Sequence, residues 1–288
     1  MIAVRAIDEF EVRRLSGTEG ASYPFWSPDS REVAFFSQGK LKKVAADGGP
    51  VQVLTDAPQA LGGTWNTDGV IVFSGRGQPL RRVSADGGQP EPVHPVAAGQ
   101  GETLWPQFLS DGRFIYLKVG SDENRNGIYL GSLDSPDETM VVGTESAATY
   151  SGGSFNNSET GRQEVYVVSY PQADQRWQVS VEGGVQPRWR ADGREMYYLA
   201  PDGTMMSVNV EEGSALRLSR PQPLFRTRTR PSGSVDEYDV TPDGSRFIVV
   251  QSIASAAPPP PRRRRRGFPR RRPGSRPRPV SGRTSPRN

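Results

Sequence analysis

The chain has 288 residues, of which 34% are hydrophobic and 9% aromatic, with 32 Gly and 26 Pro. This length suits one large all-β domain, and the Gly and Pro content favours frequent turns. The absence of Cys excludes a disulfide framework and thiolate chemistry, and no apolar run approaches the roughly 18 residues of a membrane span.

The net charge of +4 hides a strong asymmetry along the chain. Residues 252–288 contain 12 Arg and no Asp, Glu or Lys, which leaves 24 Lys and Arg against 32 Asp and Glu in the remainder, a net charge of −8. The basic segment is also rich in Pro and has almost nothing to bury. We therefore expect two parts, a folded domain over residues 1–252 and a disordered Pro/Arg-rich tail over residues 253–288.

A short motif recurs along the chain, in which an aromatic residue and a polar step precede an Asp, often Asp-Gly, and then a β-rich run. The copies span Phe25–Phe36, Thr64–Phe73, Gln107–Leu117, Arg188–Leu199 and Tyr238–Val250. The first motif aspartates are about 40 residues apart, which is the blade period of a propeller. Asp-Gly supplies the positive φ of a tight turn, so each copy predicts a hairpin.

A second hairpin follows the first, as in Lys40–Thr55 and Leu80–Val93. Four strands per unit result, and one such unit cannot bury both of its faces. We predict an all-β fold, a β-propeller of about six four-stranded blades. Their expected positions are residues 19–57, 61–96, 102–146, 147–182, 185–227, and a last blade made of 235–252 with 2–17.

Two blades are expected to be unusual. Residues 149–163 leave room for one short strand and a loop, so blade four is predicted to be incomplete. The C-terminal end supplies two inner strands and the N-terminal end two outer strands. A blade shared between the termini would close the ring and remove exposed sheet edges.

The motif copies resemble the WD40-like, or TolB-like, propeller repeat of bacteria. Residues Gly17–Ser74 and Arg176–Val210 are similar to the propeller that follows the kinase domain in bacterial eukaryotic-like serine/threonine kinases. The resemblance implies a sensor or scaffold module that lies outside the cytoplasmic membrane. This chain departs from that pattern, since it has no kinase domain, no membrane helix and fewer blades in the middle.

A search for chemistry finds no complete constellation. The phosphate loop and the HRD and DFG segments of a kinase are missing, and the only His is His94, between Pro-rich neighbours. Asp122–Gly127 matches the first half of a calcium loop, but Leu133 stands where the final Glu is required, and a polar hairpin loop accounts for the same residues. We expect no catalytic residue, no cofactor and no metal, and therefore not an enzyme.

The repeated residues have structural explanations. The motif aspartates are expected to form turns on one rim; they are Asp29, Asp68, Asp111, Asp192 and Asp243. Trp26, Trp65 and Trp189 share one position, three residues before the Asp, and Phe108 fills it in the third copy. Repetition at a blade-equivalent site predicts packing between blades.

The loops that lead into each inner strand are better candidates for binding, because in a propeller they converge around the central channel. This placement selects Tyr23, Trp105, Gln186, Arg188 and Glu237 as residues that face a partner. Solvated loop residues remain an equal alternative.

The leading hypothesis is a noncatalytic binding or scaffold propeller, a monomer that takes a protein or small-molecule ligand at one face. One alternative is a nucleic-acid or anionic-surface binder that acts through the Arg-rich tail, residues 258–288. Another is a truncated fragment without independent function. The sequence shows no signal peptide, so the expected localisation is cytoplasmic by default and extracytoplasmic if the kinase context holds.

Overall fold

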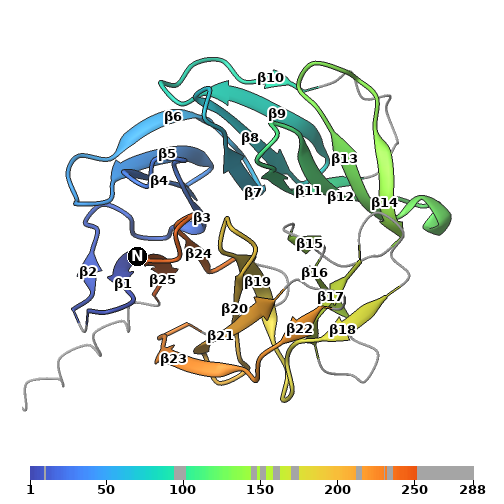
Figure 1. Cartoon of the computed structure of the whole chain (residues 1–288). Helices are drawn as coiled ribbons and strands as arrows, with labels where there is room; N and C mark the ends of the chain where they lie inside the picture. The colour runs from blue at the N-terminus through green and yellow to red at the C-terminus, as the bar shows by residue number, and fades with distance from the viewer. Residues whose placement is uncertain are drawn as a thin grey trace, which may run out of the picture. The chain divides into compact units, whose positions relative to one another are not determined.

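The computed structural model of the chain (Figure 1) describes residues 1–9, 11–93, 102–143, 148–149, 154–157, 163–169, 175–211, 216–229, 231 and 236–251. The backbone divides into two units, residues 1–253 and 254–288, and all described residues belong to the first. The predicted tail and His94 therefore lie outside the described residues.

The described strands pair into six antiparallel sheets. The first three, each given from its inner to its outer strand, are β24 (Tyr238–Val240), β25 (Arg246–Val250), β1 (Ile2–Ala6) and β2 (Arg13–Arg14); β3 (Ser22–Trp26), β4 (Glu32–Ser37), β5 (Lys40–Ala45) and β6 (Gln52–Asp56); and β7 (Ala60–Trp65), β8 (Val70–Gly75), β9 (Gln78–Ser84) and β10 (Glu91–Pro92).

The other three sheets follow in chain order. They are β11 (Glu102–Phe108), β12 (Phe114–Val119), β13 (Gly127–Gly131) and β14 (Thr139–Gly143); β15 (Ala148–Thr149), β16 (Ser154–Asn157), β17 (Glu164–Val168) and β18 (Arg176–Gln178); and β19 (Val185–Trp189), β20 (Glu195–Leu199), β21 (Thr204–Glu211) and β22 (Arg217–Leu218), with β23 (Gln222–Arg226) also paired to β21. A 3-10 turn, Glu123–Arg125, is the one helical segment of the described residues, and none of them forms a helix that could cross a membrane.

The sheets are arranged as a closed ring around their innermost strands (Figure 1). Contacts run from β24 to β3, from β3 to β7, from β7 to β11, from β12 to β15, from β15 and β16 to β19, and from β19 back to β24. This arrangement is that of an all-β propeller, as the repeat spacing predicts.

The ring closes through the two ends of the folded unit. Strand β1 pairs with β25 from Ile2↔Val250 to Ala6↔Arg246, so the N-terminal strands complete the sheet that the C-terminal hairpin begins. The blade shared between the termini is thus confirmed. In this sheet both β1 and β25 are paired on each side, so neither has a free backbone edge. Free edges are the aggregation hazard of open sheets.

The core consists of apolar clusters that each lie between two neighbouring sheets. One cluster joins Phe25 and Phe36 to Ile71 and Phe73 of the next sheet, and another joins Ile2 to Phe35 across the closure. The other clusters of the described residues follow the same rule around the ring. Each sheet therefore depends on both neighbours for its burial.

The repeated aromatic position contributes to this packing, as predicted. Trp26 is buried in the cluster shared with the preceding sheet, and Trp65, Phe108 and Trp189 pack against the corresponding clusters of their own preceding sheets. One large apolar side chain per blade thus fills the same gap each time.

The fourth sheet corrects the expectation of a missing strand. Strands β15 and β16 pair through Ala148↔Phe155 and Thr149↔Ser154, so a hairpin stands where one strand and a loop were expected. Strand β15 has only two residues. A strand that short shows no alternation of apolar and polar residues by which the sequence could predict it.

The closure can be tested through Ile2. Its side chain is fully buried between β25 and the next sheet, so Ile2→Ala should lower the free energy of unfolding by about 2–4 kcal/mol. Ile7 lies just beyond the same strand and is 40% exposed, so Ile7→Ala should cost less than about 1 kcal/mol. Urea unfolding followed by tryptophan emission measures both; equal losses would contradict a core that spans the closure.

Candidate functional site

A cavity of about 470 Å³ lies among the inner strands, and its lining comes from β3, β7, β11, β19, β24, the turns that follow them, and Asp236 just before β24. Its size falls within the range of ligand sites, which is roughly 300–1,000 Å³. Residues far apart in the sequence meet here only because the ring is closed.

The inner strands carry a repeated irregularity at the cavity. The antiparallel register shifts after Ser22, after Ala60, after Leu104 and after Val185, which marks a β-bulge in each of four inner strands. The bulge holds one residue with positive φ in every case, namely Tyr23 (48°), Gly62 (113°), Trp105 (49°) and Gln186 (56°).

Three of these residues are not glycine, although the left-handed region disfavours side chains. Each is followed by proline, which cannot donate a hydrogen bond to the partner strand, and so a bulge is the natural site for it. A non-glycine residue held in this region costs of order 1–3 kcal/mol, and such residues cluster at functional sites. Three of them at one equivalent position mark this part of the ring as a candidate site.

The five sequence-predicted residues all lie in this region, in two different settings. Tyr23, Trp105 and Arg188 line the cavity. Gln186 and Glu237 are bonded to each other: the Glu237 backbone N–H donates to Gln186 Oε1 at 2.9 Å, and Gln186 Nε2 donates to Glu237 Oε2 at 3.5 Å. Gln186 is only 4% exposed, so this pair joins two neighbouring blades.

Arg188 is the electrostatic centre of the site. Its guanidinium lies 2.9 Å from Asp236 Oδ2 and 3.6 Å from Asp239 Oδ1, both in the neighbouring sheet or its approach. Burial alone lowers the pKa of Arg188, but the two carboxylates outweigh burial and raise it above its ordinary value. Burial raises the pKa of Asp239, and the guanidinium opposes that shift. The arginine therefore stays charged, and its guanidinium N–H groups are paired with the two carboxylates.

Tyr23 adds a buried hydroxyl to the wall. Burial raises the pKa of this phenol to about 12, the Asp236 carboxylate adds to the shift, and Arg76 opposes it. At neutral pH the hydroxyl is protonated, so it can donate a hydrogen bond within or beside the cavity.

Side chains of one blade also hold the backbone of the next. Asp239 Oδ2 accepts from the Trp26 N–H at 3.1 Å, and Thr64 Oγ1 accepts from the Phe108 N–H at 3.0 Å. The acceptors occupy equivalent positions in their blades, and so do the donors. The buried Tyr238 hydroxyl donates to the Gln186 carbonyl at 2.7 Å in a further link. These bonds fix the inner strands against each other around the cavity.

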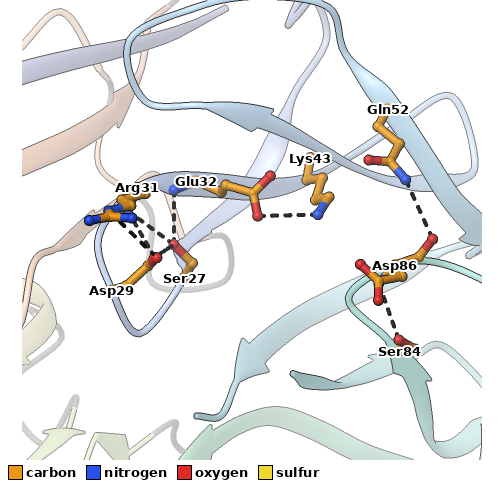
Figure 2. A network of polar contacts seen from close by, with 8 residues as sticks. All are labelled: Ser27, Asp29, Arg31, Glu32, Lys43, Gln52, Ser84 and Asp86. Carbon is orange, nitrogen blue, oxygen red and sulfur yellow. Dashed lines mark hydrogen bonds and ion pairs between the residues drawn. The ribbon is translucent and has the colours of Figure 1, made fainter. Parts of the chain in front are cut away.

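The motif aspartates are turn residues, as predicted, and Figure 2 shows one of them. Asp29 Oδ1 accepts from the Ser27 hydroxyl at 2.7 Å and from the Arg31 backbone N–H at 3.1 Å. Asp111, Asp192 and Asp243 accept from the backbone N–H two residues later in the same way. The same figure shows Gln52 reaching the Asp86 carbonyl of the next sheet.

Asp68 differs from the other motif aspartates, and the motif alone does not reveal this. In its turn Asn66 Oδ1 accepts the N–H groups of Asp68 and Val70, at 3.1 and 2.8 Å. Among the described bonds of this turn, the Asp68 carboxylate accepts no backbone N–H. It is exposed and lines the cavity. The signal in the sequence is Asn66, at a position where the equivalent turn of the next blade has Leu109.

The half-matched calcium loop has local roles in the structure. Asp122 accepts from the Asn124 N–H at the start of the 3-10 turn, and Asn126 Oδ1 accepts from the Gly120 N–H at 2.7 Å. Within the described ranges, no group of three His, Cys, Asp or Glu side chains could hold a metal ion.

No protein-family model and no curated protein matches the chain. Among solved structures, it is similar to a TolB from Agrobacterium tumefaciens with a TM-score of 0.62 and 18% identity, over 86% of this chain and 96% of that one. The chain has the TolB-like β-propeller fold. WD40 propellers are also among its structural neighbours.

Other similar structures differ in function, and one corrects an expectation. The TolB-like ring resembles a gluconolactonase from Xanthomonas campestris with a TM-score of 0.60 and 13% identity, over 86% and 89% of the two chains. It also resembles a chain of a nidogen/laminin complex with a TM-score of 0.56 and 10% identity, over 78% and 99%. The expectation that the chain is not an enzyme is overturned, because propellers with this fold include enzymes and a missing sequence motif does not exclude catalysis.

The bulge geometry can be tested at Gly62. A Cβ at this position would lie 3.2 Å from Trp105 Cδ1 and 3.3 Å from its Cα, and its φ is already unfavourable for a side chain. Gly62→Ala should therefore destabilise the TolB-like ring by about 2–3 kcal/mol. Gly39 has a positive φ of 71° with open space around it, so Gly39→Ala isolates the backbone cost of about 1 kcal/mol. Equal urea midpoints for the two variants would contradict close contact with Trp105.

The turn aspartates predict a loss of stability in acid. The Thr241 hydroxyl and the Ser245 N–H hold the pKa of Asp243 at about 2, below its ordinary value of 3.8. A lowered pKa stabilises the fold above the ordinary value, and this contribution disappears as pH falls from about 4 to about 2. Asp243→Asn should thus be less stable than the parent at pH 6, and the difference should shrink as pH falls from about 4 through about 2. A stability gap that is as large in urea titrations at pH 2 as at pH 6 would refute this role.

Proposed function

We propose that this chain is a binding propeller that takes a polypeptide partner at its central cavity. The observation that carries the proposal is the convergence of three strained, non-glycine bulge residues around a ligand-sized cavity. Residues held in this backbone region cluster at functional sites, and a rigid, preorganised wall favours binding.

The comparisons support a polypeptide as the partner. The fold is that of TolB, and one similar structure is a chain of a complex between two proteins. The resemblance of the sequence to kinase-attached propellers supports a sensor or scaffold role for the same face. That role is a proposal, and so is a monomeric state.

We propose six blades for the ring and a domain boundary at residues 252/253. Six sheets and six clusters between sheets support the blade count. The side chains of β15 and β16 lie outside the described residues, so the packing of the fourth blade rests on β17 and β18. The tail hypothesis, binding of nucleic acid or an anionic surface through residues 258–288, stays a prediction, as does the idea of a fragment without function.

The binding proposal is tested through Trp105. A heptapeptide phage library is selected on the immobilised full-length protein, and the best synthetic peptide is titrated by calorimetry. Trp105→Leu should weaken binding at least tenfold, because aromatic residues in the centre of an interface carry most of its energy. Trp177→Leu on the outer strand β18 is the matched control and should leave the affinity unchanged.

Circular dichroism and urea unfolding confirm that both variants fold. Peptides that bind the two variants equally well, or a selection that yields no peptide dependent on Trp105, would reject the cavity as the binding site.

A further inference from the structure

The charged residues that line the cavity differ in how far they are already paired with other charged groups of the chain. The lining carries the carboxylates of Asp68, Asp236 and Asp239 and the guanidiniums of Arg188 and Arg190. Arg188 is held by the two carboxylates of its neighbouring blade. Arg190 lies 2.8 Å from Asp192 and 2.9 Å from Glu195. Both cations of the described lining are thus already shared between two carboxylates, and an incoming anion would have to compete with them.

Asp68 is the carboxylate of the lining that is least engaged. Its one hydrogen bond among the described side chains is a long one, 3.4 Å from Asn66 Nδ2, and it is exposed. The lining as a whole has one more negative charge than positive charges, within a folded body whose net charge is −8. A positive group is therefore attracted both at long range and at the wall.

Aromatic faces form a second, independent preference for cations. Half-buried Trp65, Trp105 and Trp189 line the same cavity. Two indole rings of this lining already receive cations of the chain itself: Arg246 lies 5.0 Å from the centre of the Trp26 ring and Lys43 lies 5.6 Å from that of Trp65, whereas the described contacts place no cation over Trp105. A cation over an aromatic face is favourable, and more so when it is removed from water.

We propose that the cavity binds a cationic side chain of the partner, arginine or lysine, with Asp68 as its carboxylate and Trp105 as its aromatic face. This inference rests on the proposed function and adds the chemical class of the ligand. An arginine suits both groups, since its plane stacks on an indole while its donors reach a carboxylate.

The test compares three hexapeptides, acetylated and amidated, with Arg, Gln or Glu at the third position of an alanine background. Each is titrated into the full-length protein by calorimetry and by tryptophan emission. The Arg peptide should bind about tenfold more tightly than the Gln peptide, and the Glu peptide most weakly. Asp68→Asn should weaken the Arg peptide about fivefold and leave the Gln peptide unchanged.

Asp111→Asn is the matched control. Asp111 occupies the equivalent turn of the next blade, but its carboxylate is bonded to Arg113 and is not part of the described lining. This variant should leave the preference for Arg intact. Equal affinities for the Arg and Gln peptides, or equal effects of Asp68→Asn and Asp111→Asn, would overturn the proposal.

The outcome also separates this inference from the proposed function. If all three peptides bind alike and Trp105→Leu weakens all of them, the cavity binds polypeptide without selecting a cation. If none of the three binds, the cationic site is rejected, and the phage selection alone decides the proposed function.

Discussion

Burial between neighbouring sheets is the constraint on which this structure depends. The apolar clusters of the described residues each draw on two sheets, so a single blade has no core of its own. An open row of blades would leave one apolar face at each end in water. The antiparallel pair of β1 and β25 removes both open faces at once, because it completes the sheet that meets its neighbours on either side. The stability of the ring therefore depends on its closure by the termini.

The closure also creates the site. Four of the inner strands carry a bulge where they line the common cavity or lie beside it. The bulge residues with positive φ are Tyr23, Gly62, Trp105 and Gln186, and proline follows three of them, since its missing N–H is tolerated at a bulge. Bonds such as Trp26 N–H to Asp239 and Phe108 N–H to Thr64 then hold adjacent inner strands in register. A wall fixed in this way has little conformational entropy left to lose, which favours the proposed binding of a partner.

The sequence predicts the repeated features of the fold well. Motif spacing identifies the propeller, the turn role of the aspartates and the packing of Trp26, and the two ends identify the shared blade. Features made by pairs of blades are not predicted, because they depend on residues that the local pattern does not connect. Position in the chain places Gln186 and Glu237 at the cavity, but their side chains bond each other across neighbouring blades. Strand β15 escapes prediction because two residues carry no periodicity.

For the same reason, the absence of catalytic motifs in the sequence is a wrong basis for expecting that the chain is not an enzyme. A motif search does not detect groups that come from separate blades, as Arg188 of one blade and the Asp236 and Asp239 carboxylates of the next do. Their convergence becomes visible only when the ring is closed.

Asp68 and Asp111 show how a single neighbouring residue separates structure from function within one repeat. Both aspartates precede Gly in turns of the same length, in which the N–H of Asn66 or Leu109 donates to the carbonyl four residues later. The Leu109 side chain has no hydrogen-bond acceptor, and in this turn the Asp111 carboxylate accepts the Arg113 N–H. Asn66 supplies an amide oxygen that accepts two backbone N–H groups, and the turn no longer needs its aspartate. A carboxylate retained where the turn does not require it, beside a cavity whose cations are already neutralised, is free to serve a ligand.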